Sequence, residues 1–285
     1  MTDLGTTRIG PRTFRWGERT FVMGILNVTP DSFSGDGLLA GRDAVAAAVA
    51  QARAMADEGA DLLDIGGEST RPGHATVDEA EELRRVVPVI RAVRVALPDM
   101  PLSIDTTKPA VAEAALAAGA DAINDVWGVA EEATLARIAA AHAVPIFLMH
   151  NRAEPEYDDL VAEVVADLRR AIGGAIAAGV ARTDILIDPG IGFGKTAEQN
   201  LVLLRGLAGL RDLGRPILLG TSRKSTLGKV LDLPPDERLE ATLATTALGV
   251  AAGADVVRVH DVRANVRAAR MADAIVRGTW HDGRP

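Results

Sequence analysis

The sequence predicts an α/β fold, a single eight-stranded parallel (β/α)8 TIM barrel, on three observations. Short apolar, β-branched runs alternate with long alanine-rich stretches of helical periodicity. This alternation is typical of parallel βαβ units, because parallel neighbours need a long crossover connection. The 285 residues hold eight such units of about 36 residues each, which suits a closed barrel. A doubly wound open sheet is the competing architecture, and the count of eight favours the barrel.

The third observation is a short repeat at the boundaries between units. Gly-Ala-Asp stands between an expected helix and the next strand at 59–61, 119–121 and 253–255, and Gly179 with Asp184 is a looser fourth copy. A glycine in the left-handed conformation can end a helix, so that the following strand starts at once. The repeat therefore marks the turn from helix to strand.

The individual elements follow in chain order, and the whole chain, 1–285, is expected to be one domain. Residues 1–20 are expected to include a short hairpin that caps the bottom of the barrel. The expected strands are 21–26, 62–65, 102–104, 122–124, 146–149, 185–187, 217–219 and 256–259. The expected helices are 43–58, 78–96, 109–118, 131–142, 157–178, 197–213, 237–252 and 263–276.

The composition excludes several classes of function. The chain carries 31 Lys and Arg against 39 Asp and Glu, a net charge of −8, so no broad surface for nucleic acid is expected. No apolar run is long enough for a signal peptide or a membrane span, so no membrane association is expected. The chain has no cysteine, which excludes thiolate chemistry and is compatible with the cytoplasm, where we expect the protein. The five histidines lack metal-ligand spacing, so no catalytic zinc is expected.

Polar residues gather where the expected strands end. In a β/α barrel the chemistry lies at the carboxyl ends of the strands. Helix capping explains an Asp or Asn at some of these places, but it does not explain polar residues of different charge at nearly every strand end. We therefore expect one pocket at this end, formed from Asn27, Asp64, Asp105, Asn124 with Asp125, His150, Asp188, Ser222-Arg223-Lys224, and Arg258 with His260.

Three loops at these strand ends are rich in turn formers. They span 27–37, 66–73 and 188–196. In the second loop Arg71 can meet an anion, and in the first Asn27 and Asp36 offer hard oxygen ligands that suit Mg²⁺ shared with a phosphate. The third loop is not a nucleotide motif, because only three residues separate Gly190 from Gly194 where the P-loop needs four.

Seven segments of the chain, in order from about residue 22 to 263, resemble the motifs of the dihydropteroate synthase family. They are 24–34, 66–73, 103–106, 123–125, 188–195, 221–225 and 258–261. The resemblance implies a β/α barrel, in agreement with the count of units. It also implies an enzyme that joins 6-hydroxymethyl-7,8-dihydropterin diphosphate to 4-aminobenzoate and releases 7,8-dihydropteroate and diphosphate.

The resemblance further implies a role for each motif residue. The pterin-binding set would be Asp105, Asn124, Asp188 and Lys224. The diphosphate end would be Asn27, Arg258 and His260, with Asn27 as a ligand of Mg²⁺ and Asp36 as a second one. The 4-aminobenzoate environment would be Thr70, Arg71, Phe193, Lys224 and Ser225. The catalytic residues among them would be Asp105, Asp188, Lys224, Arg258 and His260.

These roles agree with the chemistry of the side chains. Asn and ionised Asp can read the donors and acceptors on the edge of a pterin ring in a buried slot. Arg258 offers a bidentate fork to phosphate oxygens. One departure concerns the metal: Gly35-Asp36-Gly37 replaces the more usual Asp-Gly-Gly order and shifts the acidic residue by one position.

Two other functions compete with the synthase. A pterin-binding methyltransferase would share the barrel and the pterin slot, but it would not need the diphosphate set Arg258 and His260. A catalytically silent homologue would bind pterin or serve as a partner protein. The resemblance also implies a homodimer formed through late helices, for which the apolar residues Val266, Met271 and Ile275 are the available support.

Overall fold

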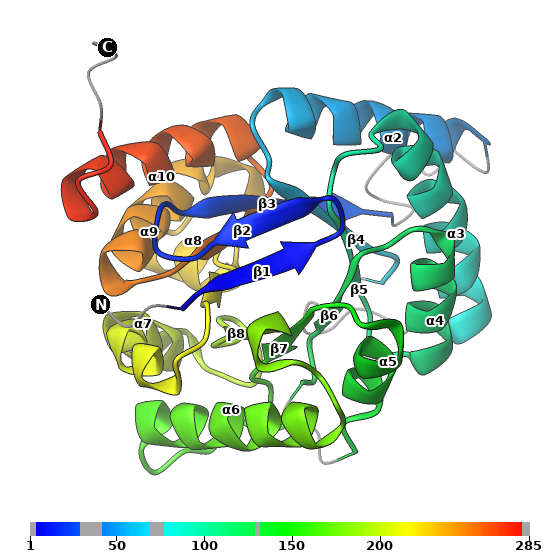
Figure 1. Cartoon of the computed structure of the whole chain (residues 1–285). Helices are drawn as coiled ribbons and strands as arrows, with labels where there is room; N and C mark the ends of the chain where they lie inside the picture. The colour runs from blue at the N-terminus through cyan, green and yellow to red at the C-terminus, as the bar shows by residue number, and fades with distance from the viewer. Residues whose placement is uncertain (1–3, 29–41, 69–76, 129–131, 281–285) are drawn as a thin grey trace.

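A computed structural model of the protein describes residues 4–28, 42–68, 77–128 and 132–280. Eight parallel strands form one sheet in the order β8–β7–β6–β5–β4–β3–β10–β9. A parallel bridge between Ile187 and Ile217 joins the two ends of this sheet, and the Ile187 N–H donates to the Pro216 carbonyl at 3.0 Å. Helices surround the strands (Figure 1). The predicted barrel is confirmed, and the open sheet is excluded.

The strands lie where the alternation predicted them, with ends that differ by at most one residue. They are β3 (Phe21–Asn27), β4 (Leu62–Gly66), β5 (Leu102–Asp105), β6 (Ala122–Asp125), β7 (Ile146–Met149), β8 (Ile185–Asp188), β9 (Leu218–Leu219) and β10 (Val256–Val259). The helices are α2 (Arg42–Asp57), α3 (Glu79–Ala96), α4 (Pro109–Ala118), α5 (Thr134–His142), α6 (Leu160–Ala177), α7 (Ala197–Arg205), α8 (Ser225–Leu231), α9 (Leu239–Ala252) and α10 (Val262–Val276). Within the described part of the chain, no helix has the length and apolar character needed to cross a lipid bilayer.

Two helical segments differ from the expectation. The helix expected over 197–213 ends at Arg205, and a 3₁₀ helix, η2 (Leu207–Leu213), continues from it. Gly206 lies at the break, where an added Cβ would come within 2.8 Å of the Val161 side chain. The seven-residue helix α8 was not expected, because two turns are too short to show a helical period.

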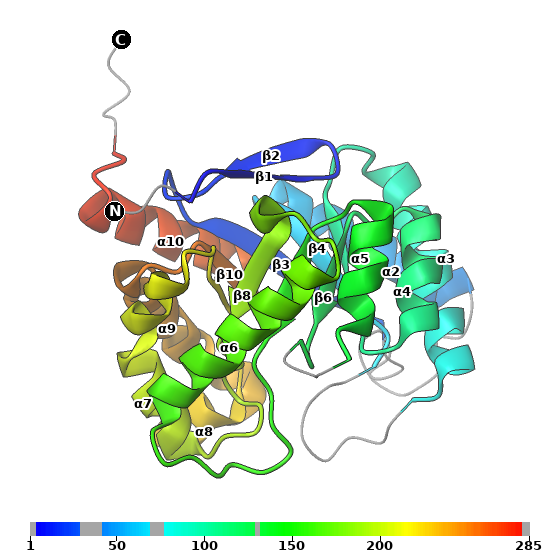
Figure 2. The same cartoon turned by 60° about the horizontal axis from the view of Figure 1, so that its bottom comes forward.

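An antiparallel hairpin covers the bottom of the barrel. It consists of β1 (Thr6–Ile9) and β2 (Arg12–Arg15). Ile9, Phe14 and Trp16 are buried in one cluster with the apolar side chains that line the lower barrel interior. Figure 2 shows this hairpin at one end of the barrel and α8 at the other. Ligands therefore have to reach the interior from the end at which the strands finish.

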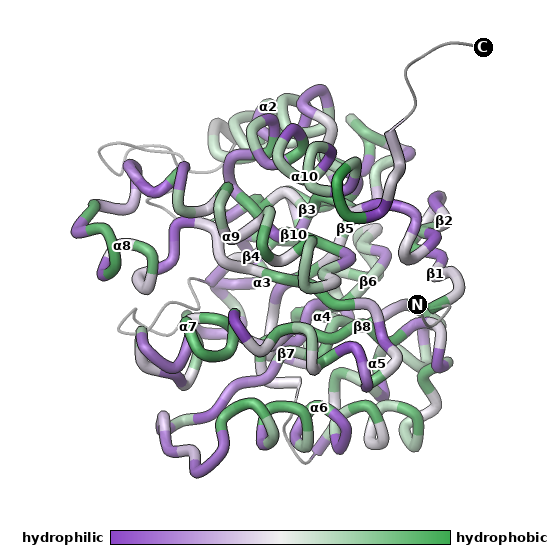
Figure 3. Tube along the Cα trace, turned by 90° about the vertical axis from the view of Figure 1, so that its left-hand side faces the viewer, coloured by the Kyte–Doolittle hydropathy of each residue, from purple (hydrophilic) through white to green (hydrophobic). Residues whose placement is uncertain are grey.

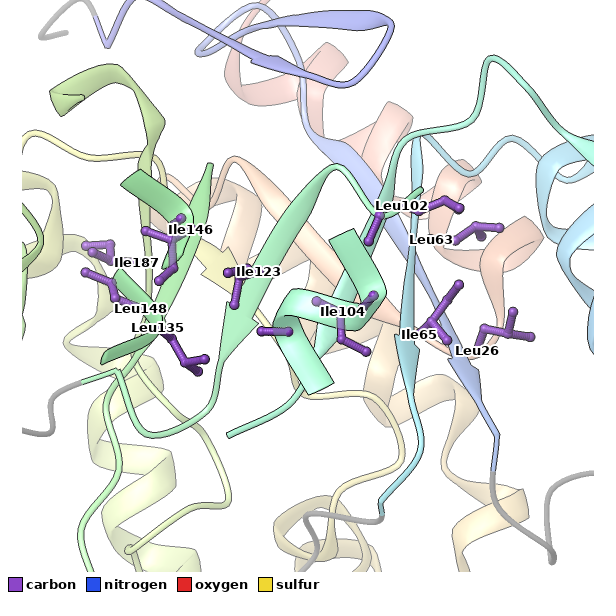
Figure 4. Close-up of a cluster of buried hydrophobic side chains, with 14 of the residues drawn as sticks. Leu26, Leu63, Ile65, Leu102, Ile104, Ile123, Leu135, Ile146, Leu148 and Ile187 are labelled. Atoms are coloured by element: carbon purple, nitrogen blue, oxygen red, sulfur yellow. The ribbon is translucent and has the colours of Figure 1, made fainter. Parts of the chain in front are cut away.

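A second apolar cluster fills the space between the strands and the helices. It contains the strand residues that alternate with the interior ones, and Figure 4 labels several of them, among them Leu63, Ile104 and Ile123, together with Leu135 of α5. The helices turn one apolar face toward this layer, and α6 alternates between hydrophobic and hydrophilic colours along its length (Figure 3). The two clusters together hold the strands rigid, so that their ends can carry a site.

The Gly-Ala-Asp repeat has the structure that its sequence predicted. Gly59, Gly119 and Gly253 end their helices with φ of +100°, +113° and +100°. Each following Asp then exchanges two hydrogen bonds with the start of the neighbouring strand. Asp61 N–H donates to the Val22 carbonyl at 2.8 Å, and the Val22 N–H donates to Asp61 Oδ2 at 2.8 Å.

The other two copies repeat this exchange with different neighbours. The aspartate at 121 exchanges both bonds with Leu102, and the aspartate at 255 exchanges both with Ile217. The looser copy makes different bonds: the Asp184 N–H donates to the Ala181 carbonyl at 2.9 Å, and its carboxylate accepts from Thr183 at 3.2 Å. The three aspartates therefore tie adjacent strands together at the bottom of the barrel.

We predict that Asp61→Ala lowers the free energy of unfolding by about 2 kcal/mol, because it leaves the buried Val22 N–H without its acceptor. It also removes the partner of Arg19, which Asp61 contacts at 2.6 Å. The matched control is Asp184→Ala, which we expect to change this free energy by less than about 0.5 kcal/mol. Urea denaturation measures both. Equal losses in the two variants would show that the strand tie is not what stabilises the turn.

Candidate functional site

The upper interior of the barrel is polar because the strands alternate with a period of two. Residues two positions apart on a strand face the same side. Leu62, Ala122, Leu186 and Val256 belong to the apolar interior cluster. The residues two positions further along the same strands are Asp64, Asn124, Asp188 and Arg258. The barrel thus has an apolar floor and a polar upper layer at the carboxyl ends of its strands.

Arg258 joins two carboxylates across this layer. Its Nε donates to Asp64 Oδ2 at 2.6 Å, and its Nη2 donates to Asp105 Oδ2 at 2.7 Å. Burial works against the charge on the guanidinium, but the attraction of Asp64 and Asp105 outweighs burial and raises the pKa of Arg258. The three side chains therefore form one ionic cluster inside the barrel.

Asp105 keeps one oxygen for another partner. Its Oδ1 is buried and makes no hydrogen bond to any residue in the described part of the chain. Burial raises the pKa of Asp105 to about 7, against the opposing effect of Arg258. A buried acceptor without a donor is costly by about 1–3 kcal/mol, and a ligand N–H would satisfy it.

Asp188 stands at the start of a loop that turns back over the site. Its Oδ1 accepts the Gly190 N–H at 2.7 Å, and burial raises the pKa of Asp188 although Lys224 opposes this. Lys224 Nζ donates to the Ile191 carbonyl and lies 4.2 Å from the centroid of the Phe193 ring. The fold thus brings Asp188, Phe193 and Lys224 together from two separate loops.

Lys195 holds the same loop from within the protein, and the sequence did not single it out for this. Its Nζ donates to the carbonyls of Gly190 and Phe193 at 3.0 and 2.9 Å and to His150 Nδ1 at 2.9 Å. Burial lowers the pKa of Lys195 to about 7. These three bonds fix the path of the loop that carries Phe193.

His150 does not line the expected pocket. Its side chain is fully buried, and Nε2 lies 3.1 Å from Asp167 Oδ2. Burial lowers the pKa of His150 to about 4, so the ring is neutral at pH 7. The expectation that every strand-end residue converges on the pocket is therefore wrong for His150, which supports Lys195 instead.

Some of the remaining predicted site residues lie within the described part of the chain, and others lie outside it. Ser222 Oγ accepts the His260 N–H at 3.1 Å and lies 3.0 Å from His260 Nδ1, which fixes the imidazole at the end of β10. Ser225 is the exposed first residue of α8, and Asn27 is half-buried at the end of β3. Thr70, Arg71 and Asp36 lie outside the described residues.

Asp64 is the residue whose importance sequence reasoning understated. It was one of many polar residues at strand ends, yet the structure makes it the hub of the upper layer, with bonds from Ser103 Oγ at 2.6 Å and Asn124 Nδ2 at 2.9 Å besides Arg258. The available signal was an acidic residue inside the strand Leu62–Gly66, whose other residues are apolar or glycine.

The described residues do not form a metal centre by themselves. Among them, no group of three or more His, Cys, Asp or Glu side chains is placed to hold a metal ion. Asn27 is the one candidate metal ligand that lies within the described part of the chain. A metal at this end of the barrel would therefore need oxygens from a bound ligand or from residues outside the described part of the chain.

Comparison with known proteins agrees with this geometry. A family model described as "Pterin binding enzyme" matches residues 23–260. The chain is 52% identical to a dihydropteroate synthase of Clostridium beijerinckii over 95% of this chain and 99% of that protein. It is 49% identical to that of Bacillus subtilis, over 96% of this chain and 95% of that protein.

Solved structures give the same result. The dihydropteroate synthase of Clostridium difficile, determined with pteroic acid, superposes with a TM-score of 0.89 at 51% identity, over 93% of this chain and 99% of that one. That of Xanthomonas albilineans, determined with 4-aminobenzoic acid, superposes with a TM-score of 0.88 at 46% identity, over 95% and 98%. By the family model, these identities and the shared fold, the chain belongs to the dihydropteroate synthase family of pterin-binding enzymes.

Proposed function

We propose that the protein condenses 6-hydroxymethyl-7,8-dihydropterin diphosphate with 4-aminobenzoate to give 7,8-dihydropteroate and diphosphate. The observation that carries this proposal is the buried polar layer, in which Asp105 Oδ1 lacks a donor among the described residues and Lys224 lies near Asp188 and against the Phe193 ring. The relatives' ligands support it, because one was determined with pteroic acid and another with 4-aminobenzoic acid.

The pterin ring would bind against the acceptors of the upper layer. Asp105, Asn124 and Asp188 offer oxygens to the N–H groups of the ring, and Lys224 offers a donor to its ring acceptors. Each of these three oxygen-bearing residues is buried and on a different strand. This fixes the ring in one orientation, with its methylene toward the mouth of the barrel.

The diphosphate would lie at that mouth, beside Asn27, His260 and Arg258. Magnesium suits this place, because it usually binds substrate phosphates together with one or two protein oxygens, and Asn27, with Asp36 as a second ligand, would supply them. Bound there, Mg²⁺ would neutralise charge on the leaving diphosphate. Arg258 would act from the pterin side, because two of its nitrogens already bind Asp64 and Asp105.

In the reaction the bond between the methylene carbon and the diphosphate oxygen breaks, and the oxygen keeps the electron pair. The pterin ring delocalises the positive charge that develops, and the carboxylate of Asp188 stabilises it. The amine nitrogen of 4-aminobenzoate then bonds to the methylene and releases a proton to water. This amine is neutral at pH 7, so the step needs no strong general base.

The 4-aminobenzoate would bind outside the pterin. Phe193 and the aliphatic part of Lys224 would contact its ring, and Ser225 at the start of α8 would meet its carboxylate, with Thr70 and Arg71 completing the pocket. Lys224 Nζ already lies 4.2 Å from the centroid of the Phe193 ring. The two ligands would thus share Lys224.

We also propose a homodimer and a cytoplasmic location. Leu248 on α9 and Met271 and Ile275 on α10 are 70%, 62% and 72% exposed, and these two helices pack side by side. Val266, named with them from the sequence, is instead buried against the core. Apolar side chains left on neighbouring helices suit a contact between copies. The lack of cysteine is compatible with the cytoplasm.

The direct test uses purified protein with both substrates and Mg²⁺, and it measures dihydropteroate by chromatography. We expect formation that depends on all three. Pterin binding without product would indicate the silent homologue, and methyl transfer from a methylated pterin would indicate the methyltransferase.

We predict that Lys224→Met lowers kcat/KM by about 100-fold, because a charge-assisted hydrogen bond to the substrate is worth about 1.5–3 kcal/mol. Lys229→Met is the matched control, since Lys229 is an exposed lysine of the same helix region. We expect it to retain activity within about twofold. Equal activity of the two variants with equal melting temperatures would remove Lys224 from the site.

We predict that His260→Ala weakens binding of the diphosphate substrate by about tenfold and leaves 6-hydroxymethylpterin binding within about twofold. Arg258→Ala should weaken both ligands, because Arg258 also holds Asp105. Titration calorimetry measures the four affinities. If His260→Ala affects both ligands alike, His260 does not belong to the diphosphate end.

A further inference from the structure

Asp64 is buried in the middle of β4 and cannot touch a ligand itself. Its side chain is 0% exposed. Oδ1 accepts from Ser103 Oγ at 2.6 Å, and Oδ2 accepts from Asn124 Nδ2 at 2.9 Å and from Arg258 Nε at 2.6 Å. Any effect of Asp64 on a bound ligand must therefore pass through these three neighbours.

The contact with Asp64 decides which way the Asn124 amide faces. A carboxylate oxygen can only accept hydrogen bonds, so the amide atom that meets Asp64 has to be Nδ2. The carbonyl oxygen, Oδ1, is then the end that remains for a ligand, and it makes no hydrogen bond to a described residue. Asn124 therefore presents an acceptor to the slot.

The contact with Arg258 has a similar effect on Asp105. Arg258 is held at Nε by Asp64 and at Nη2 by Asp105, so the plane of the guanidinium is fixed at two points. Asp105 Oδ2 is thereby occupied, and Oδ1 is left without a donor among the described residues. Through two different neighbours, Asp64 leaves two acceptor oxygens for a ligand.

We infer that Asp64 is a positioning residue that sets the hydrogen-bond polarity of the slot and so selects heterocycles that present N–H donors on the bound edge. The inference rests on the proposed function, because it names the feature by which the pterin would be chosen. A ring with a carbonyl in place of an amino group would set oxygen against oxygen, which is unfavourable in a buried site.

The test compares 2-aminopteridin-4-one with pteridine-2,4-dione, in which an oxo group replaces the 2-amino group and N1 carries a hydrogen. The wild-type protein should prefer the amino compound. Asp64→Leu removes the acceptor at similar size, so the Asn124 amide can turn and donate to the oxo group. We expect the ratio of the two dissociation constants to fall at least about tenfold. A purely structural effect would weaken both probes alike and leave the ratio unchanged, which would overturn the inference.

Asp64→Asn is the matched control, because its amide can keep all three hydrogen bonds. Its oxygen would take the place of Oδ2, and its nitrogen would donate to Ser103, whose hydroxyl would turn to the Leu63 carbonyl, now 3.3 Å away. We expect the preference to stay within about threefold, with both probes bound more weakly because a charge is lost. Loss of the preference in Asp64→Asn would overturn the inference, and this holds even if Asp64→Leu does not fold.

Calorimetry of wild type separates this inference from the proposed function. If wild type binds neither pteridine, the proposed function fails. If wild type binds the amino compound and the ratio is the same in Asp64→Leu, the function stands and only the role of Asp64 is removed.

Discussion

The upper half of the barrel depends on the guanidinium of Arg258 between Asp64 and Asp105. Three carboxylates, those of Asp64, Asp105 and Asp188, are buried near two cations, Arg258 and Lys224. Buried carboxylates that lacked such partners would take up protons or destabilise the fold. Arg258 gives these carboxylates a fixed countercharge, and the same carboxylates can stabilise a cation that develops on a bound ring.

The sequence was sufficient for the fold and for the polar layer at the carboxyl ends of the strands. Strands could be placed to within a residue because buried parallel strands are continuous apolar runs, and the left-handed glycines of the repeat marked where helices end. It did not foretell that His150 turns away from the pocket or that Asp64 joins three side chains. Both depend on which strands become neighbours and on how deeply each residue is buried. The sequence alone does not show how deeply a polar residue at a strand end is buried.

The loop from Asp188 to Lys195 owes its shape to two lysines that act from opposite sides. Lys195 binds two of its carbonyls from within the protein, and Lys224 binds the Ile191 carbonyl from the site. A glycine-rich segment has little preference of its own, so these cations determine where Phe193 lies. Its carbonyls therefore meet the two lysines, while the Gly190 N–H donates to the Asp188 carboxylate at 2.7 Å.

The side chains of Ile9, Phe14 and Trp16 close the lower end of the barrel, so a ligand reaches the polar layer from the upper end. A ligand in the polar layer has no rear exit, and whatever binds nearer to Phe193 stands between it and the solvent. The ligand that binds last must dissociate first. A compound bound at the outer position would block dissociation of the inner ligand, and its residence time would set the rate at which the inner ligand dissociates.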